Sequence, residues 1–138
     1  EWVAQEFNVD ELVIMKSNAF HLDTLFTPVI NNENKLVAII GCTSLMEKDS
    51  VENLRQFAKR KNIELVEVPP EDAIGTDDEL GEFAVNCQPL PGYLVGPTRF
   101  RSNKVAPLLK ELGVMHITVP TTQFRLSGGA IHCLTNEL

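Results

Sequence analysis

A cysteine close to the C-terminal end of the sequence has neighbours that suit an exposed nucleophile. Cys133 follows the glycine pair Gly128 and Gly129, and His132 directly precedes it. Adjacent glycines allow the backbone to approach another group closely, or to adopt torsion angles that a side chain forbids. The apolar run 130–134 predicts a strand that would hold the thiol on a rigid element. The alternative is a buried thiol that packs as a small hydrophobic group, the commonest fate of a free cysteine.

A nucleophilic cysteine needs a proton-transfer partner, which is usually remote in the sequence. His21 and Asp23 lie in residues 20–28, whose alternating pattern predicts a strand with both side chains on one face. Asp23 could then orient the imidazole or hold a cation. His132, next to Cys133 on a predicted strand, would face the opposite way. His21 is therefore the candidate partner.

The remaining cysteines and histidine are interpreted as packing residues. Cys42 and Cys87 lie in apolar runs and are expected to be buried, and His116 lies inside an apolar strand. Three widely spaced cysteines without a C-x-x-C pair predict neither a disulfide framework nor a zinc site. We therefore expect a reducing, cytoplasmic setting, and we expect no metal and no cofactor.

The composition limits the classes of partner. The chain has 138 residues, enough for a single domain over 1–138 with a hydrophobic core. Its net charge of −7 argues against nucleic acid, whose phosphates attract Lys and Arg, and is compatible with a small cationic substrate. The longest apolar runs, such as 36–40, are too short to cross a bilayer, so no membrane partner is expected.

Two similar series of elements predict an α/β chain with an internal repeat. The first unit, 36–88, contains a strand, a helix and a second strand at 63–68. The second unit, 92–136, contains a strand, a helix and a second strand at 114–119. Repeated units of this kind bury their faces only against neighbours, and about three or more are needed for stability. The chain is therefore expected to be part of a longer repeat protein, or to have its open edges covered by another chain.

Two segments taken together resemble the guanidino-group-modifying enzyme superfamily. They are Phe20-His21-Leu22-Asp23-Thr24-Leu25-Phe26 and Gly128-Gly129-Ala130-Ile131-His132-Cys133-Leu134-Thr135. The superfamily includes arginine deiminases, dimethylarginine dimethylaminohydrolases, agmatine deiminases and arginine:glycine amidinotransferases. The resemblance covers the C-terminal half of such an enzyme, from about residue 12 onward. It implies a pentein-type α/β propeller of repeated ββαβ modules, of which this chain would form a partial ring.

The resemblance also implies roles for the matching residues. Cys133 would attack the guanidinium carbon, His21 would protonate the leaving amine and then activate water, and Asp23 would bind guanidinium nitrogens. A carboxylate pairs well with a planar guanidinium, and a positioned histidine contributes ~10²–10⁴-fold to a rate. Thr24 follows Asp23 where agmatine deiminases have an acidic residue, which favours arginine-like substrates. The remaining acidic residues of the superfamily would come from N-terminal modules.

Three further polar residues are candidates near the substrate. Arg99 and Arg101 follow a strand candidate at 93–95 and could bind a substrate carboxylate, or could be a solvated pair. Asn86 ends a predicted strand at 83–87, and could contact the substrate or support the residues that do.

The expected function is a cysteine-dependent hydrolase that cleaves the guanidino C–N bond of arginine or a methylated arginine. The reaction would pass through a covalent thiouronium intermediate and leave citrulline. An arginine amidinotransferase would use the same intermediate with an amine acceptor. A non-catalytic pentein-like module that has kept the motif residues is the third possibility. A homo-oligomer or additional N-terminal modules would complete the site.

Overall fold

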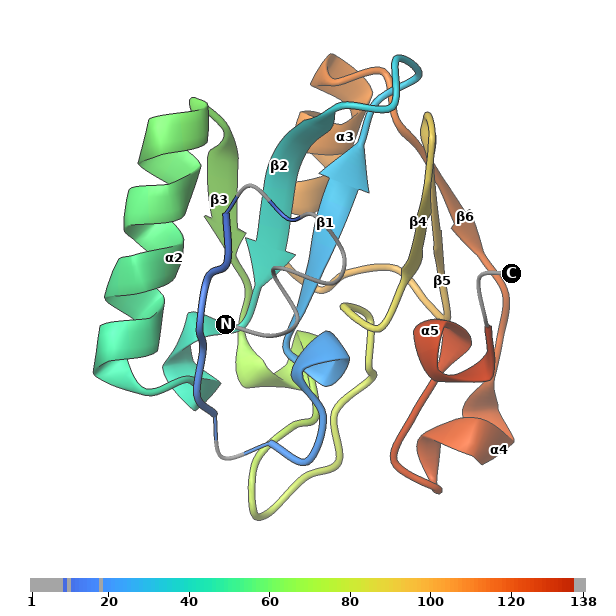
Figure 1. Cartoon of the computed structure of the whole chain (residues 1–138). Coiled ribbons are helices and arrows are strands. Elements are labelled where there is room, and N and C mark those ends of the chain that lie inside the picture. The colour runs from blue at the N-terminus through green and yellow to red at the C-terminus, as the bar shows by residue number, and fades with distance from the viewer. Residues whose placement is uncertain (1–8, 10, 18, 136–138) are drawn as a thin grey trace.

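A computed structural model describes residues 9, 11–17 and 19–135, and shows two three-stranded sheets of identical topology. In each sheet the first two strands form an antiparallel hairpin, and the third strand runs parallel to the second. The strands are β1 (Phe26–Ile30), β2 (Leu36–Gly41) and β3 (Glu64–Glu67), followed by β4 (Gln88–Leu90), β5 (Tyr93–Gly96) and β6 (Met115–Thr118). Helix α2 (Lys48–Lys61) connects β2 to β3, and α3 (Val105–Glu111) connects β5 to β6. The described chain is therefore mixed α/β and contains two ββαβ units (Figure 1).

The C-terminal ends of both connecting helices follow from local sequence. Helix α2 buries Val51, Leu54 and Ala58 along one side, the spacing of an amphipathic helix. It ends at Asn62, which adopts a left-handed conformation with φ of 53°. Helix α3 is followed by Gly113, whose φ of 66° is also in the left-handed region. Each turn directs the chain straight back into the parallel strand of its unit.

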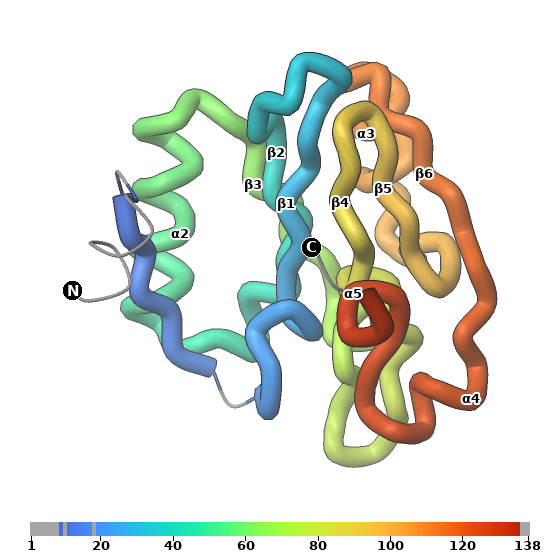
Figure 2. The backbone as a smooth tube through the Cα atoms, turned by 45° about the vertical axis from the view of Figure 1, so that its right-hand side comes forward, coloured from blue at the N-terminus to red at the C-terminus, as the bar shows by residue number. Residues whose placement is uncertain are grey.

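One hydrophobic core runs through both units. Strand β1 of the first sheet lies beside β4 of the second, as Figures 1 and 2 show. The apolar side of α3 belongs to the same buried cluster as the strands of the first sheet. The largest fully buried apolar side chains are Leu25, Ile40, Leu94, Val29, Val85 and Val105. The units are thus packed together by side chains from both.

The segments at one end of the sheets differ from the sequence prediction. Residues 20–25 were expected in a strand, but η1 (Leu22–Thr24) is a short 3₁₀ helix and the strand begins at Phe26. Residues 83–87 form a turn before β4, and 130–134 contain the short helix α5 (Ile131–Leu134) instead of a strand. Short apolar runs do not distinguish a strand from a buried helical turn, which explains these errors. A further short helix, α4 (Thr122–Arg125), lies in the polar segment after β6.

The long segment between β3 and β4 is fixed by a buried carboxylate. It starts with η3 (Pro70–Asp72), and the Asp72 side chain has no exposed surface. Its two oxygens accept hydrogen bonds from the backbone N–H groups of Arg101 (2.6 Å) and Ser102 (3.0 Å). This contact ties the segment to the residues before α3, and the backbone oxygen of Asp72 also accepts a hydrogen bond from the N–H of Val85 at 3.0 Å, next to Asn86.

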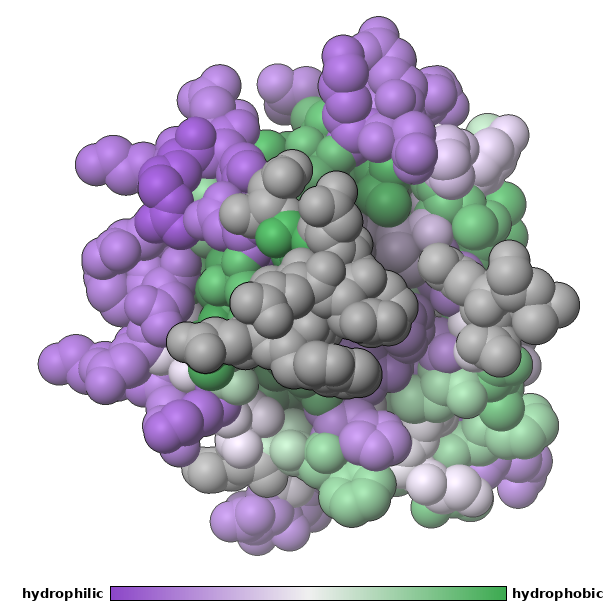
Figure 3. Space-filling view, in the orientation of Figure 1, coloured by the Kyte–Doolittle hydropathy of each residue, from purple (hydrophilic) through white to green (hydrophobic). Residues whose placement is uncertain are grey.

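Part of the surface is hydrophobic. In Figure 3, hydrophobic residues gather on the right-hand side of the molecule, over β6 and α4. Exposed apolar side chains of β6, of α4 and of the residues next to them include Met115, Ile117, Val119, Phe124 and Leu126. Within the described ranges, no helix has both the length and the apolar character needed to cross a membrane.

Candidate active site

The carboxylate of Asp23 is the meeting point of three segments that are remote in the sequence. Its Oδ2 atom lies 2.8 Å from Nδ1 of His132 and accepts hydrogen bonds from Asn86 Nδ2 (3.2 Å) and Cys133 Sγ (3.4 Å). Asp23 belongs to η1, Asn86 to the turn before β4, and the other two residues to α5. These contacts gather a thiol, an imidazole, an amide and a carboxylate at one end of the sheets.

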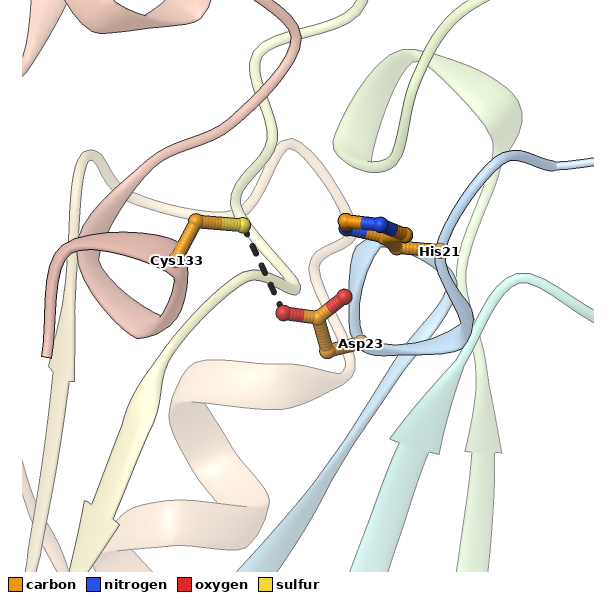
Figure 4. Close-up of side chains that lie close together, drawn as sticks. All are labelled: His21, Asp23 and Cys133. Atoms are coloured by element: carbon orange, nitrogen blue, oxygen red, sulfur yellow. Dashed lines mark hydrogen bonds between the residues drawn. The ribbon is translucent and has the colours of Figure 1, made fainter. Parts of the chain in front are cut away.

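His21 lies at the same place. It precedes η1 as its N-cap residue, and its exposed ring stacks on Phe20 with the ring centroids 4.4 Å apart. One side-chain atom from each of His21, Asp23 and Cys133 lies within 4.8 Å of the other two. In Figure 4 the thiol and the His21 ring lie on either side of the carboxylate. The structure thus brings these residues together by a 3₁₀ turn, although the sequence pattern predicted a strand.

The glycine pair before α5 permits the close approach of the Cys133 side chain. Gly128 has φ of 87°, a conformation that residues with a Cβ rarely adopt. At Gly129, an added Cβ would lie 3.0 Å from both Cβ and Sγ of Cys133. A side chain at this position would therefore press on the thiol. The prediction that the pair allows a close backbone approach agrees with this geometry.

The prediction that His132 faces away from the site is wrong, because its ring lies against Asp23. On a strand, consecutive side chains point to opposite faces, but on a helical turn they are about 100° apart. Because α5 is helical, the His132 ring reaches Asp23 while Cys133 reaches the same carboxylate. The helical reading of this run would have revealed His132 as a member of the site.

Asn86 lies beneath the site and has no exposed surface. Its Nδ2 group donates to both the backbone oxygen (3.1 Å) and the carboxylate of Asp23. Its Oδ1 accepts from the backbone N–H of Ala130 (2.9 Å) and, at 3.4 Å, from that of Cys133. Its hydrogen bonds therefore join Asp23 to the α5 segment, and its predicted contact with substrate stays a prediction.

Arg99 lies elsewhere. It lines a hollow together with Phe100, Val105, Ala106, His116 and Thr118. Among the described residues, no hydrogen bond or ion pair joins it to Asp23, His21 or Cys133. Arg101 forms ion pairs with Glu79 and Glu82. The expected binding of a substrate carboxylate by these arginines stays a prediction.

The environment keeps Asp23 charged and distinguishes Cys133 from the other cysteines. Partial burial raises the pKa of Asp23, but the hydrogen bonds from His132, Cys133 and Asn86 outweigh it and leave the pKa below its ordinary value. Burial raises the pKa of the thiols of Cys42 and Cys87, and both side chains are enclosed in the core. Of the three cysteines in the sequence, all of them described, Cys133 is the exposed one. It is therefore the thiol available for chemistry.

The same side chains have the donor types of a metal site. His21, Asp23 and Cys133 form the one group of three His, Cys or acidic residues that the described part of the chain places within ligand distance. Zinc accepts nitrogen, sulfur and carboxylate ligands of this kind. A cation bound by this group would meet the Asp23 carboxylate.

Comparisons with known proteins give structural neighbours only. No protein-family model matches the sequence, and no curated protein matches it. Among solved structures, the N-terminal domain of ArgZ, an arginine dihydrolase from the ornithine–ammonia cycle in cyanobacteria, is similar. With that domain bound to its product, the TM-score is 0.69 at 23% identity over 98% of this chain. With a cysteine-to-serine variant bound to substrate, the TM-score is 0.70 at 22% identity over 98% of this chain.

AgrE is a second structural neighbour. Its ternary complex with ornithine and NAD+ has a TM-score of 0.69 at 21% identity over 90% of this chain. The chain spans 44% to 45% of the ArgZ N-terminal domain structures and 16% of AgrE. At this identity the likeness concerns the fold: the two ββαβ units correspond to part of a larger domain.

Proposed function

We propose that this protein is a cysteine-dependent hydrolase that acts on the guanidino group of arginine or a methylated arginine. The observation that carries the proposal is the position of an exposed thiol and an imidazole on either side of a charged carboxylate. A guanidinium is planar, cationic and resistant to attack, so it must be held in place while the nucleophile meets its carbon. Cys133, His21 and Asp23 are the residue types for these tasks.

Each side chain has one role in the proposed reaction. Asp23 pairs with the guanidinium N–H groups and fixes the plane of the group. The Cys133 thiolate forms an S–C bond to the guanidinium carbon, and the departing nitrogen takes a proton from His21 as its C–N bond breaks. His21 then removes a proton from water, whose oxygen attacks the thiouronium carbon and displaces the sulfur. The products are ammonia, or a methylamine from a methylated substrate, and citrulline.

A second product is favoured by the structural neighbours. ArgZ is described as an arginine dihydrolase, and AgrE was solved with ornithine. A dihydrolase carries hydrolysis past the first C–N bond. If this protein acts in the same way, ornithine accumulates and citrulline does not. Product analysis therefore decides between the two forms of the proposal.

The proposed propeller is supported by a comparison of the two sheets. In the first sheet one face is nearly inaccessible, with exposures of 0% for Ala38, 0% for Ile40, 3% for Val66 and 5% for Val68. The strand register pairs Ile40 with Val66 and, in the second sheet, Val95 with Ile117. The corresponding face of the second sheet is open, with exposures of 43% for Tyr93, 39% for Ile117 and 46% for Val119.

We propose that another ββαβ unit of the same polypeptide covers this open face. The second unit already shares a core with the first, since the buried side chains of α3 belong to the same hydrophobic cluster as the strands of the first sheet. The ArgZ domain is more than twice the length that this chain spans, which leaves room for such units. They would form a pentein-type propeller, with this chain as its C-terminal half, and could bring further acidic residues to Asp23.

Free cysteines and the absence of a disulfide among them suit a cytoplasmic location.

The test is an assay of the intact protein with L-arginine and with methylated arginines. Citrulline, ornithine and released amine are measured for the natural sequence and for Cys133→Ser. The proposal expects guanidino hydrolysis by the natural sequence and none by the variant, with unchanged circular dichroism. A folded protein that leaves every guanidino substrate intact would show instead a non-catalytic module.

A further inference from the structure

The side chain of Asn86 bonds both to Asp23 and to the segment that carries Cys133. Asp23, Asn86 and Cys133 are far apart in the sequence, and no two of them belong to the same helix or strand. The Asn86 amide group connects them directly: its NH₂ group faces η1, and its carbonyl oxygen faces the start of α5. The backbone oxygen of Asn86 also accepts a hydrogen bond from the N–H of His132 at 3.2 Å.

We propose that Asn86 is a positioning residue that sets the distance between the Asp23 carboxylate and the Cys133 thiol. This inference rests on the proposed function, because it assigns Asn86 a role in aligning those two groups for a guanidinium. An amide performs both halves of the task at once, since its NH₂ group donates and its carbonyl oxygen accepts. A carboxylate could accept from Ala130 but could not donate to Asp23 when ionised.

The turn that holds Asn86 is itself constrained. The backbone N–H of Asn86 donates to the oxygen of Phe83, which has φ of 55°. The next residue, Cys87, is enclosed in the core, and its thiol donates to the Ala84 oxygen at 2.9 Å. Contacts of the residues before and after Asn86 therefore hold its backbone in place, and a residue that positions others needs such support.

Two substitutions separate positioning from simple support of the fold. Asn86→Ala removes both halves of the link. Asn86→Asp keeps the acceptor for Ala130, but places a carboxyl group about 3 Å from that of Asp23, in the place of the donor. The carboxyl groups of Asp23 and of the new aspartate repel each other when both are ionised, so they share a proton as the pH falls. The shared proton restores a hydrogen bond between the two side chains. Ser50→Ala is the matched control, because it removes another buried polar contact, to Lys16, away from the site.

The first readout is amide hydrogen exchange at Ala130, which does not depend on activity. The loss of one acceptor corresponds to roughly tenfold in exchange rate. We expect this increase in Asn86→Ala, and little change in Asn86→Asp and Ser50→Ala. An unchanged rate at Ala130 in a folded Asn86→Ala variant would overturn the link.

The second readout is kcat and KM against pH. In Asn86→Ala we expect kcat to fall about 100-fold, the scale of a 1 Å misplacement, with a smaller change in KM. In Asn86→Asp the activity relative to the natural sequence should rise as the pH falls, because the shared proton restores the donor; in Asn86→Ala this ratio should stay flat. Equal and flat ratios for both variants would overturn positioning and leave a structural role.

If Asn86→Ala does not fold, the pH profile of Asn86→Asp alone decides. If exchange responds as expected but the natural sequence does not act on any guanidino compound, the link stands and the proposed function fails.

Discussion

The Nδ1 atom of His132 lies 2.8 Å from Oδ2 of Asp23, although the two residues are 109 positions apart. The same oxygen accepts from Cys133 and Asn86. Three groups around one oxygen explain why the carboxylate stays ionised despite partial burial. A guanidinium held by Asp23 would share this oxygen with them or use Oδ1.

Replacement of Asp23 by Asn should weaken substrate binding more than it weakens folding. The charge-assisted pair with a guanidinium is lost, which raises KM by roughly 10- to 100-fold. For the natural sequence, the Asp23 contribution to KM should be constant from pH 5 to pH 8, because its pKa lies below the ordinary 3.8. Steady-state kinetics across this range tests both statements. A pH-dependent KM that becomes constant in Asp23→Asn would contradict the lowered pKa.

The same residue makes a prediction about acid stability. A carboxyl group whose pKa is lower in the folded state stabilises the fold at pH values above its unfolded-state pKa, near 3.8. That stabilisation is lost as the pH falls through the folded-state pKa. Urea unfolding should therefore show a stability difference between the natural sequence and Asp23→Asn at pH 7 that narrows below pH 4. A difference that widens in acid would contradict the direction of the shift.

Substitution of His21 should act on the chemical step. His21→Ala removes the proposed proton donor and is expected to lower kcat by about 10²–10⁴-fold with a smaller effect on KM. His116→Gln is the control, because His116 lies in the separate hollow with Arg99 and Phe100. Rapid-quench measurement of adduct formation and breakdown identifies the affected step. Equal kinetics for both variants would remove His21 from the mechanism.

Metal removal should leave activity unchanged. The proposed mechanism uses a carboxylate, a thiolate and an imidazole directly. These are the side chains of His21, Asp23 and Cys133 that could otherwise bind a metal ion, so a bound metal is not required. Dialysis against a chelator followed by assay and metal analysis tests this expectation. Activity that disappears with the chelator and returns with added metal would indicate a metallohydrolase.

Gly96 should tolerate no side chain. An added Cβ would lie 2.6 Å from Cys87 Sγ and 3.1 Å from His116 Nε2. Overpacking of this kind costs roughly 1–3 kcal/mol of the free energy of unfolding. Chemical denaturation of Gly96→Ala measures the loss, and the double variant with Cys87→Ala should be more stable than the sum of the single effects predicts. Strict additivity would show that the two positions do not interact.

The sequence was sufficient for the parts of the fold with long periodic patterns. Helix α2 has one consistent buried side over 14 residues, and β2 is a continuous apolar run that is buried on both faces, so their type and approximate limits were predictable. The burial of Cys42 and Cys87 followed from their apolar neighbours. The pairing of His21 with Cys133 was a hypothesis from residue type and strand pattern, and the family resemblance is what implied that both residues and Asp23 share one site.

The details of the site depend on short turns that periodicity does not resolve. The run with Cys133 forms one helical turn, and this changes the direction of His132 from away from Asp23 to toward it. The buried position of Asn86 follows from the turn after Phe83, whose positive φ no sequence pattern indicated. Such turns are fixed by tertiary hydrogen bonds rather than by local preference, so only the structure shows them.

The central claim is that Cys133 is the nucleophile, and covalent labelling with a haloacetamidine probe tests it most directly. The probe resembles a guanidinium, and mass spectrometry of the digested protein locates the adduct. We expect labelling of Cys133 alone, prevented by excess arginine, because Cys42 and Cys87 are buried with raised thiol pKa values and serve as internal controls. A folded protein that hydrolyses arginine but carries no adduct at Cys133 would contradict the account.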